Sequence, residues 1–209
     1  MKNKENSILK DTLILFAITL VAGLLLGFFN QLTKGPIEAR RLAEKKETYQ
    51  KVYAEAVNFG YTDQLDTYVI DSDKILASAE TDLSNVTIDE ILEAKDGDDQ
   101  VIGYVVSATS SEGYGGDITM AVGIKLDGTV VSVDMITINE TQGIGMKATE
   151  DSFIGQYGGK KVPAFDLVKG DASGDDQINA ISGATITSKA VTKAINGAIW
   201  AVDQYINQP

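Results

Sequence analysis

The sequence contains neither cysteine nor histidine among its 209 residues. Without cysteine the chain forms no disulfide bond and ligates no iron–sulfur cluster. Without either residue it also has no zinc site of the usual kind, no haem ligation by histidine or cysteine, and no cysteine or histidine catalyst. Redox chemistry in this chain would therefore need an organic cofactor.

Basic side chains are outnumbered, with 18 Lys and Arg against 30 Asp and Glu and a formal net charge of −12. Residues 1–51 hold nine basic and five acidic side chains, a net of +4, whereas the rest holds nine basic and 25 acidic, a net of −16. An acidic body repels phosphate backbones, so no nucleic-acid partner is expected. The length suits one anchored domain with a hydrophobic core.

One long apolar run lies near the N-terminus, where Asp11 is the only charged residue between Lys10 and Lys34. As a helix this run is long enough to cross ~30 Å of hydrocarbon. It predicts an N-terminal tail over residues 1–11 and a transmembrane anchor over 12–33, in contact with membrane lipid. A buried core helix rarely lacks a polar face over this length, and "FFNQLTKGPIEARR" offers no small-x-small site for a signal peptidase.

Residues 34–60 are expected to form a membrane-proximal helix or linker, redirected at its start by Gly35-Pro36. The basic side chains of this segment suit either lipid head groups or a solvated helix face. Counting Lys and Arg on the two sides of the apolar run places the large domain on the inner side of the membrane.

Residues 61–209 have the pattern of an α+β domain with an antiparallel sheet packed by helices. Strands are expected in "VIGYVVSAT", "DITMAVGIKL" and "VVSVDMITI", and Asp127-Gly128 predicts a hairpin turn. A short helix is expected in "TIDEILEAKDGDDQ", where Thr87 and Glu90 have the spacing of a capping box. A last helix is expected to begin near Thr187 and to bury residues at three- and four-residue spacing: Val191, Ala194, Ile195, Ala198, Ile199 and Val202.

Three loops have the composition of ligand-binding segments. "GYGG" (113–116) allows close backbone approach, "NETQGIGMK" (139–147) combines a carboxylate, a hydroxyl and glycines, and "SGAT" (182–185) precedes a helix whose free N–H groups favour phosphate. Each loop also has a plain structural explanation as a turn, a surface bulge or a helix cap. Spacing alone leaves both explanations open.

Taken in order, "GYGGDITMAVGI", "DG", "ETQGIGMK" and "ISGATITSKAVTKAI" behind one apolar run resemble the FMN-binding domain family. The resemblance is closest to the G subunits of Rnf electron-transport complexes, with the C subunits of sodium-pumping NADH:quinone oxidoreductases as near relatives. It covers nearly the whole chain and is weakest between Tyr61 and Asp99.

The resemblance implies covalent FMN, joined through its phosphate to the hydroxyl of Thr185 by a separate flavin transferase that uses FAD. It implies that Ser182, Gly183 and Ala184 hold the phosphate at the helix N-terminus, while Thr187 and Ser188 remain as caps. The two other loops would flank the flavin ring with Tyr114, Gly115, Gly116, Glu140, Thr141, Gly143, Gly145 and Lys147.

The resemblance implies that this chain relays electrons within an Rnf-type ion-translocating ferredoxin:NAD oxidoreductase and catalyses no turnover alone. It therefore also implies partners among the other subunits of a membrane complex, and a globular domain on the extracytoplasmic side. This orientation is opposite to the one from the charge count. It is preferred, because long folded domains translocate with little regard to loop charge.

Two positions depart from the family pattern. Asn179 stands where an Asp usually lies six residues before the acceptor threonine, and Gln142 stands where a proline is common. If the Asp assists the transferase by its charge, flavin attachment would be slower here; if it is a turn residue, Asn serves equally well. Two alternative functions stay open: a C subunit of the quinone reductase, and a non-redox membrane-anchored binding or scaffold module.

Overall fold

The computed structural model describes residues 13–16, 18–25, 28 and 45–207, and the chain divides into two units, residues 1–44 and residues 45–209. In the first unit the described residues are helical, with exposed side chains. No helix formed by described residues is long and apolar enough to cross a membrane. Of the expected anchor over 12–33, residues 12, 17, 26, 27 and 29–33 lie outside the described ones.

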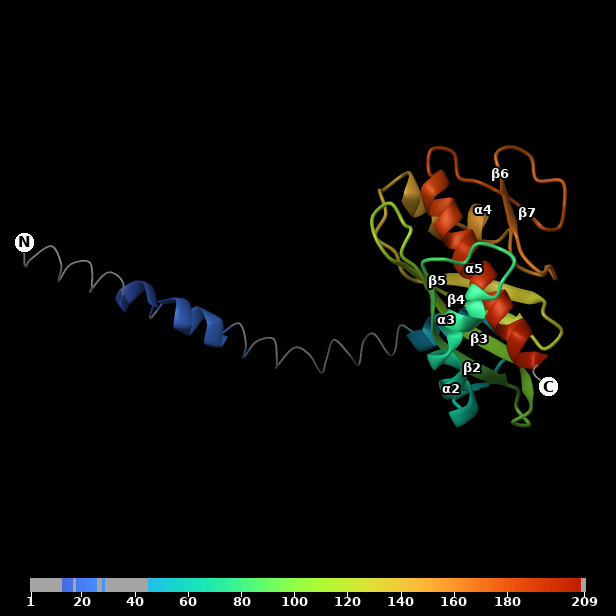
Figure 1. Cartoon of the computed structure of the whole chain (residues 1–209), viewed down its shortest axis with the longest axis horizontal. Coiled ribbons are helices and arrows are strands. Elements are labelled where there is room, and N and C mark those ends of the chain that lie inside the picture. Colours follow the sequence, from blue (N-terminus) through green and yellow to red (C-terminus); the bar gives the residue numbers. More distant parts are fainter. Residues whose placement is uncertain (1–12, 17, 26–27, 29–44, 208–209) are drawn as a thin grey trace, which may run out of the picture. The chain divides into compact units, whose positions relative to one another are not determined.

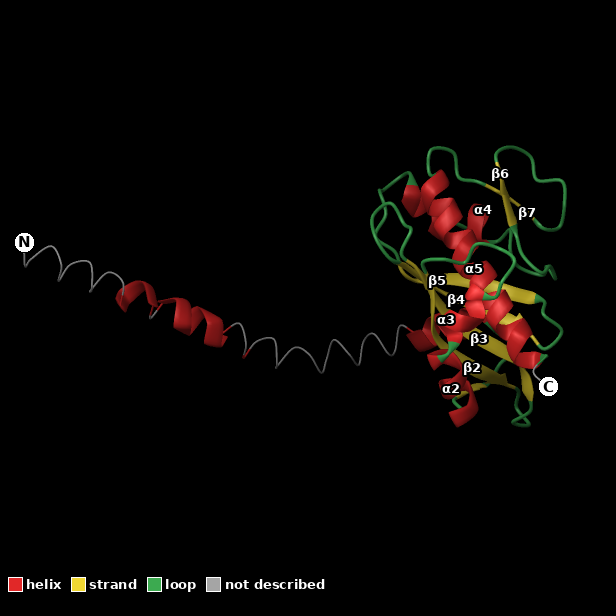
Figure 2. Cartoon of the chain, in the orientation of Figure 1, coloured by secondary structure: helices red, strands yellow, loops and turns green. Residues whose placement is uncertain are grey.

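The second unit is built on a five-stranded antiparallel sheet (Figures 1 and 2). Its strands are neighbours in sequence order: β1 (Asn58–Gly60), β2 (Val86–Lys95), β3 (Val101–Ser110), β4 (Ile118–Lys125) and β5 (Val130–Thr137). A separate parallel pair joins β6 (Asp166–Val168) to β7 (Gln177–Asn179). The three strands expected from sequence are confirmed as β3, β4 and β5. The expected hairpin turn is also confirmed, with Gly128 at φ +86°.

The long helix α5 (Thr185–Ile206) covers one face of the sheet (Figure 1). Near its C-terminal end lie α2 (Asp63–Ile70) and α3 (Ser72–Ala77), where the Trp200 indole N–H donates to the Ile75 carbonyl at 2.9 Å. Near its start lie a 3₁₀ helix (Gly145–Thr149) and α4 (Asp151–Ile154). The six apolar side chains of α5 expected to be buried are all buried.

The opposite face of the sheet is covered by a short helix over residues 45–52 and the residues after it. Tyr49, Val52, Tyr53 and Ala56 pack on side chains of β2, β3 and β4, and the Tyr53 hydroxyl donates to the Ile102 carbonyl at 2.7 Å. Residues 45–60, expected to belong to a membrane-proximal helix or linker, thus lie in the compact unit, and residues 45–52 of this range are helical. Both faces of β3 and β4 are buried, which explains why these strands read as nearly continuous apolar runs.

The helix expected over residues 87–100 is wrong, because most of this segment is strand β2. A bulge between Ile88 and Glu90 interrupts the two-residue alternation of the strand. Ile88 and Ile91 therefore both face the core beneath α5 although they are three residues apart. A spacing of three residues between buried side chains is also typical of a helix. The strand forms because this segment pairs with β3, which the local sequence pattern does not reveal.

Candidate functional site

The segment "SGAT" turns the chain into α5. Gly183 has φ +81°, a left-handed conformation that glycine adopts without strain, and Ala184 occupies the N-cap position with no side-chain hydrogen bond. The helix begins at Thr185, two residues earlier than expected, and the Thr185 side chain is exposed.

The expectation that Thr187 and Ser188 cap this helix is wrong, because both lie inside its first turns and are buried. The Ser188 hydroxyl donates to the Ala184 carbonyl at 2.9 Å and accepts from the Ile181 N–H at 3.0 Å. Within the described part of the chain, the backbone N–H groups of Thr185, Ile186 and Thr187 meet no acceptor. These donors and the helix dipole form a site that favours an anion.

The three loops singled out in the sequence meet around one pocket of about 560 Å³. This volume lies within the range of about 300–1,000 Å³ that small-molecule sites occupy. The pocket is lined by Tyr114, Glu140, Thr141, Ile144, Gly145, Gly183, Ala184, Thr185, Ile186 and Thr187. Residues from three distant segments thus surround the exposed Thr185 side chain.

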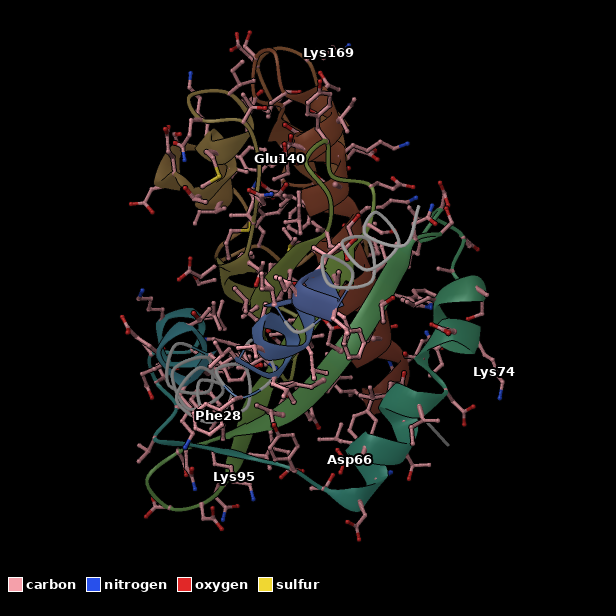
Figure 3. All side chains as sticks on the ribbon, turned by 90° about the vertical axis from the view of Figure 1, so that its left-hand side faces the viewer. Phe28, Asp66, Lys74, Lys95, Glu140 and Lys169 are labelled. Atoms are coloured by element: carbon pink, nitrogen blue, oxygen red, sulfur yellow. The ribbon has the colours of Figure 1, made fainter. Side chains whose placement is uncertain are left out.

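Glu140 links two of these loops. Its side chain is buried, and its Oε1 accepts a hydrogen bond from the Gly115 N–H at 3.2 Å. The contact is possible because Gly115 has no side chain: a Cβ there would lie 1.9 Å from the Asn139 carbonyl oxygen. Figure 3 shows Glu140 at the same end of the domain as Lys169, away from Asp66 and Lys95. The pocket therefore lies where α5 begins.

Two lining residues were missed in the sequence. Ile144 and Ile186 are 46% and 55% exposed, and with Tyr114 at 73% they form an apolar rim. The sequence held a signal for both residues: Ile144 is an apolar residue inside a glycine-rich loop, and Ile186 is an apolar residue on the polar side of a helix. Six expected site residues do not line the pocket: Ser182, Ser188, Gly115, Gly116, Gly143 and Lys147.

Asn179 has a structural role at the end of β7. Its Oδ1 accepts from the Ala172 N–H at 2.8 Å, and its own N–H donates to Gln156 Oε1 at 2.7 Å. An aspartate would offer the same acceptor atom to Ala172. The geometry favours the turn-residue explanation of this departure from the family pattern.

Comparisons with known proteins agree with this geometry. Residues 113–199 match the FMN-binding domain family, and residues 1–52 match the RnfG N-terminal region. The first match spans all three loops of the pocket and most of α5. The crystal structure of Shewanella oneidensis NqrC is similar in fold, with a TM-score of 0.53 at 21% identity over 75% of this chain and 72% of that one.

Two relatives extend the comparison. The chain is 33% identical over 198 residues to the G subunit of the Na(+)-translocating ferredoxin:NAD(+) oxidoreductase complex of Acetobacterium woodii, covering 92% of this chain and 90% of that protein. It is 45% identical over 106 residues to the G subunit of the proton-translocating complex of Clostridium ljungdahlii, covering 51% and 56%. These two relatives are named for different coupling ions.

Proposed function

The chain belongs to the family of G subunits of ion-translocating ferredoxin:NAD(+) oxidoreductase complexes, and we propose that it carries FMN at Thr185 as an electron relay in such a complex. Its function is that of a flavoprotein subunit in electron transport, and its partners are other subunits of a membrane-associated complex. The covalent bond to Thr185, and the roles of individual pocket residues, are the proposal.

The observation that carries the proposal is the position of Thr185. Its exposed side chain opens into the pocket directly beside three backbone N–H groups that lack acceptors among the described residues. A phosphodiester formed on the Thr185 hydroxyl would keep one negative charge facing these donors. The residues present therefore fit a phosphate-bearing cofactor.

The other lining residues fit the remainder of FMN, which when bound supplies a group that takes up and passes on electrons. Gly183 and Ala184 leave space beside the Thr185 hydroxyl, because neither has a side chain beyond Cβ. The rim formed by Tyr114, Ile144 and Ile186 offers apolar surface that would exclude water from a ring system. Glu140 would bring a carboxylate to the pocket wall, where charge tunes cofactor electronics.

Membrane attachment is proposed through the apolar run. Residues 12–33 would form a single anchor in contact with lipid, residues 34–60 would lead to the domain, and the domain would lie on the extracytoplasmic side. The match of residues 1–52 to the RnfG N-terminal region supports a common role for this segment in the family. A flavin transferase would be a transient partner during maturation.

Intact mass spectrometry of the full chain, produced with and without a flavin transferase, tests the proposal. We expect a gain of one FMN adduct only with the transferase, and fluorescence that survives denaturation on a gel. Thr185→Val removes the hydroxyl but keeps the β-branched shape, so it should abolish the adduct. Thr149→Val, an exposed threonine outside the pocket lining, is the matched control and should keep it.

Peptide mapping distinguishes the remaining outcomes. An adduct on Thr187 or on Ser188 would contradict the assignment of Thr185. Absence of any adduct in the wild-type chain, with a transferase shown to be active on another substrate, would favour a non-redox binding or scaffold module.

A further inference from the structure

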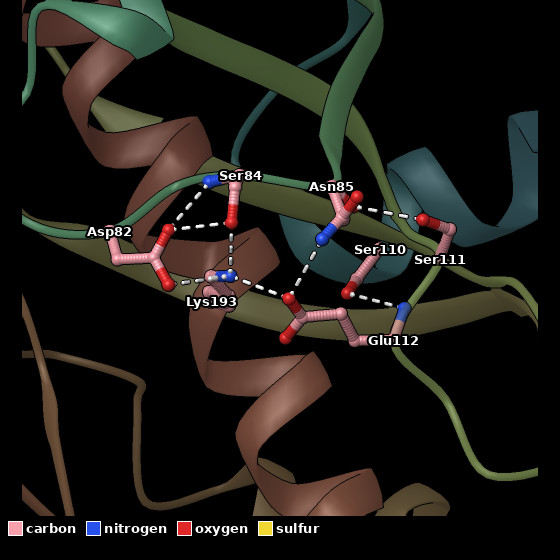
Figure 4. Close-up of polar contacts among 7 residues, drawn as sticks. All are labelled: Asp82, Ser84, Asn85, Ser110, Ser111, Glu112 and Lys193. Atoms are coloured by element: carbon pink, nitrogen blue, oxygen red, sulfur yellow. Dashed lines mark hydrogen bonds and ion pairs between the residues drawn. The ribbon is translucent and has the colours of Figure 1, made fainter.

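Lys193 is a buried lysine in the middle of α5, with a side chain only 5% exposed. Burial of an ammonium group is costly unless its charge and its donors find partners. Its Nζ donates to Glu112 Oε1 at 2.7 Å and to Ser84 Oγ at 3.1 Å, and it pairs with Asp82 Oδ2 at 3.1 Å (Figure 4). All three ammonium donors are thereby engaged.

The two carboxylates around Lys193 differ in exposure. The Glu112 side chain is 26% exposed and also accepts from Asn85 Nδ2 at 3.0 Å. The Asp82 side chain is 67% exposed and holds the Ser84 hydroxyl at 2.6 Å. Solvent screens exposed ion pairs more strongly, so the shorter and less exposed pair with Glu112 carries more of the interaction.

Both members of this pair are charged at neutral pH. Hydrogen bonds from Lys193 and Asn85 lower the pKa of Glu112 below its ordinary value. Desolvation acts to lower the pKa of Lys193, but the hydrogen bonds and charges of Glu112 and Asp82 outweigh it and raise the pKa. The ion pair between Lys193 and Glu112 is therefore intact near neutral pH.

Glu112 directly precedes the glycine loop of residues 113–116, which carries Tyr114 to the rim of the pocket. Beyond Tyr114, the Gly115 N–H is bound by Glu140. The loop is thus held on one side by α5 through Lys193 and on the other by the loop that contains Glu140.

The helix sets the distance between this anchor and the start of the pocket. Lys193 lies eight residues after Thr185, which is about 12 Å along a helix that rises ~1.5 Å per residue. Because α5 is continuous from Thr185 to Ile206, the position of the loop relative to Thr185 is fixed by a rigid element.

We propose that the Lys193–Glu112 ion pair is a positioning device that holds Tyr114 and its loop at the pocket where α5 begins. The Lys193–Asp82 pair holds the segment before β2 and leaves the loop unaffected. Only the flavin measurement below rests on the proposed function.

Amide hydrogen exchange of the full chain without flavin tests the device directly. Glu112→Gln keeps the shape but removes the charge. It should speed exchange of the Gly115 and Gly116 amides, which donate to Glu140 Oε1 and to the Gly113 carbonyl, about tenfold, equivalent to ~1.4 kcal/mol. Asp82→Asn is the matched control on the same lysine. It should speed exchange of the Ser84 amide, which donates to Asp82 Oδ1, and leave the Gly115 and Gly116 amides within about twofold of wild type. Equal effects of the two variants on the loop, or no effect of either, would overturn the proposal.

A second measurement uses the chain loaded with FMN by the transferase. At equal flavin content, iodide should quench the flavin fluorescence at least about twofold more strongly in Glu112→Gln than in wild type or Asp82→Asn, because an open loop admits solvent. Lys193→Met should show the same stronger quenching as Glu112→Gln. Lys193→Arg, which keeps the positive charge, should show quenching close to that of the wild type. Unchanged quenching in both Glu112→Gln and Lys193→Met would contradict the positioning role. Failure to load flavin at all would refute the proposed function while the exchange data still decide the inference.

Discussion

Replacing Gly115 by alanine probes the close approach on which the pocket depends. The added Cβ would lie 1.9 Å from the Asn139 carbonyl oxygen and 3.0 Å from its carbonyl carbon. Ordinary contact begins near 3.4 Å, so the two loops must separate by about 1.5 Å, which breaks the hydrogen bond from the Gly115 N–H to Glu140. Overpacking and the lost hydrogen bond together should lower the free energy of unfolding by ~2–4 kcal/mol.

Gly116→Ala is the matched control in the same loop. Gly116 has φ +119° and no heavy atom within 4 Å of its added Cβ, so only backbone strain of ~1–2 kcal/mol is expected. Urea unfolding followed by circular dichroism measures both, and a slope of ~2 kcal/mol per molar gives a midpoint lowered by about 1–2 M for Gly115→Ala. If Gly115→Ala proves no more destabilising than Gly116→Ala, the close approach of the two loops is refuted.

Three further outcomes are expected. Asn196→Leu should lower the free energy of unfolding by ~2–5 kcal/mol, because Asn196 makes two buried hydrogen bonds to the backbone N–H and C=O of Phe165, at 2.8 and 3.0 Å. A decrease below ~2 kcal/mol in urea unfolding would contradict the importance of these two bonds. Asn179→Asp should leave the rate of flavin attachment unchanged, since either side chain accepts from Ala172; a faster time course of adduct formation would restore the charge argument. The difference in free energy of unfolding between wild type and Glu112→Gln should be largest at pH 7 and shrink as pH falls below about 4. The pKa of Glu112 is lower in the folded chain than in the unfolded chain, so its charge stabilises the fold above the unfolded-state pKa and this stability is lost as the carboxylate is protonated. Urea unfolding that gives the same difference at every pH would contradict this.

Several features of the site could be predicted from the sequence because they are local. The hairpin at Asp127-Gly128 depends on two adjacent residues, and the buried face of α5 depends on a spacing of three and four. The loops were found for the same reason, since glycines, hydroxyls and one carboxylate cluster within a few positions. Their association with FMN came from the order of the motifs along the chain, which resembles the family.

Other features could not be predicted because they depend on contacts between distant segments. The bulge at Ile88–Glu90 lets apolar residues of β2 three positions apart face the same side, a spacing that is also typical of a helix. Only pairing with β3 decides between strand and helix. Because α5 starts at Thr185, three N–H groups find no acceptor among the described residues where the sequence suggested caps, and Ser188 bonds to Ala184 and Ile181 instead.

The sequence by itself determined the exclusion of cysteine and histidine chemistry, the apolar run near the N-terminus, the acidic body, three strands and the family to which the motifs point. These follow from composition and short-range periodicity, which need no knowledge of the fold. Only the tertiary structure decided which of the expected loop residues line the pocket, that Ile144 and Ile186 form its rim, and that Lys193 holds Glu112. The physical reason is that side chains from separate loops meet only when the sheet and α5 pack together, and no local pattern encodes that meeting.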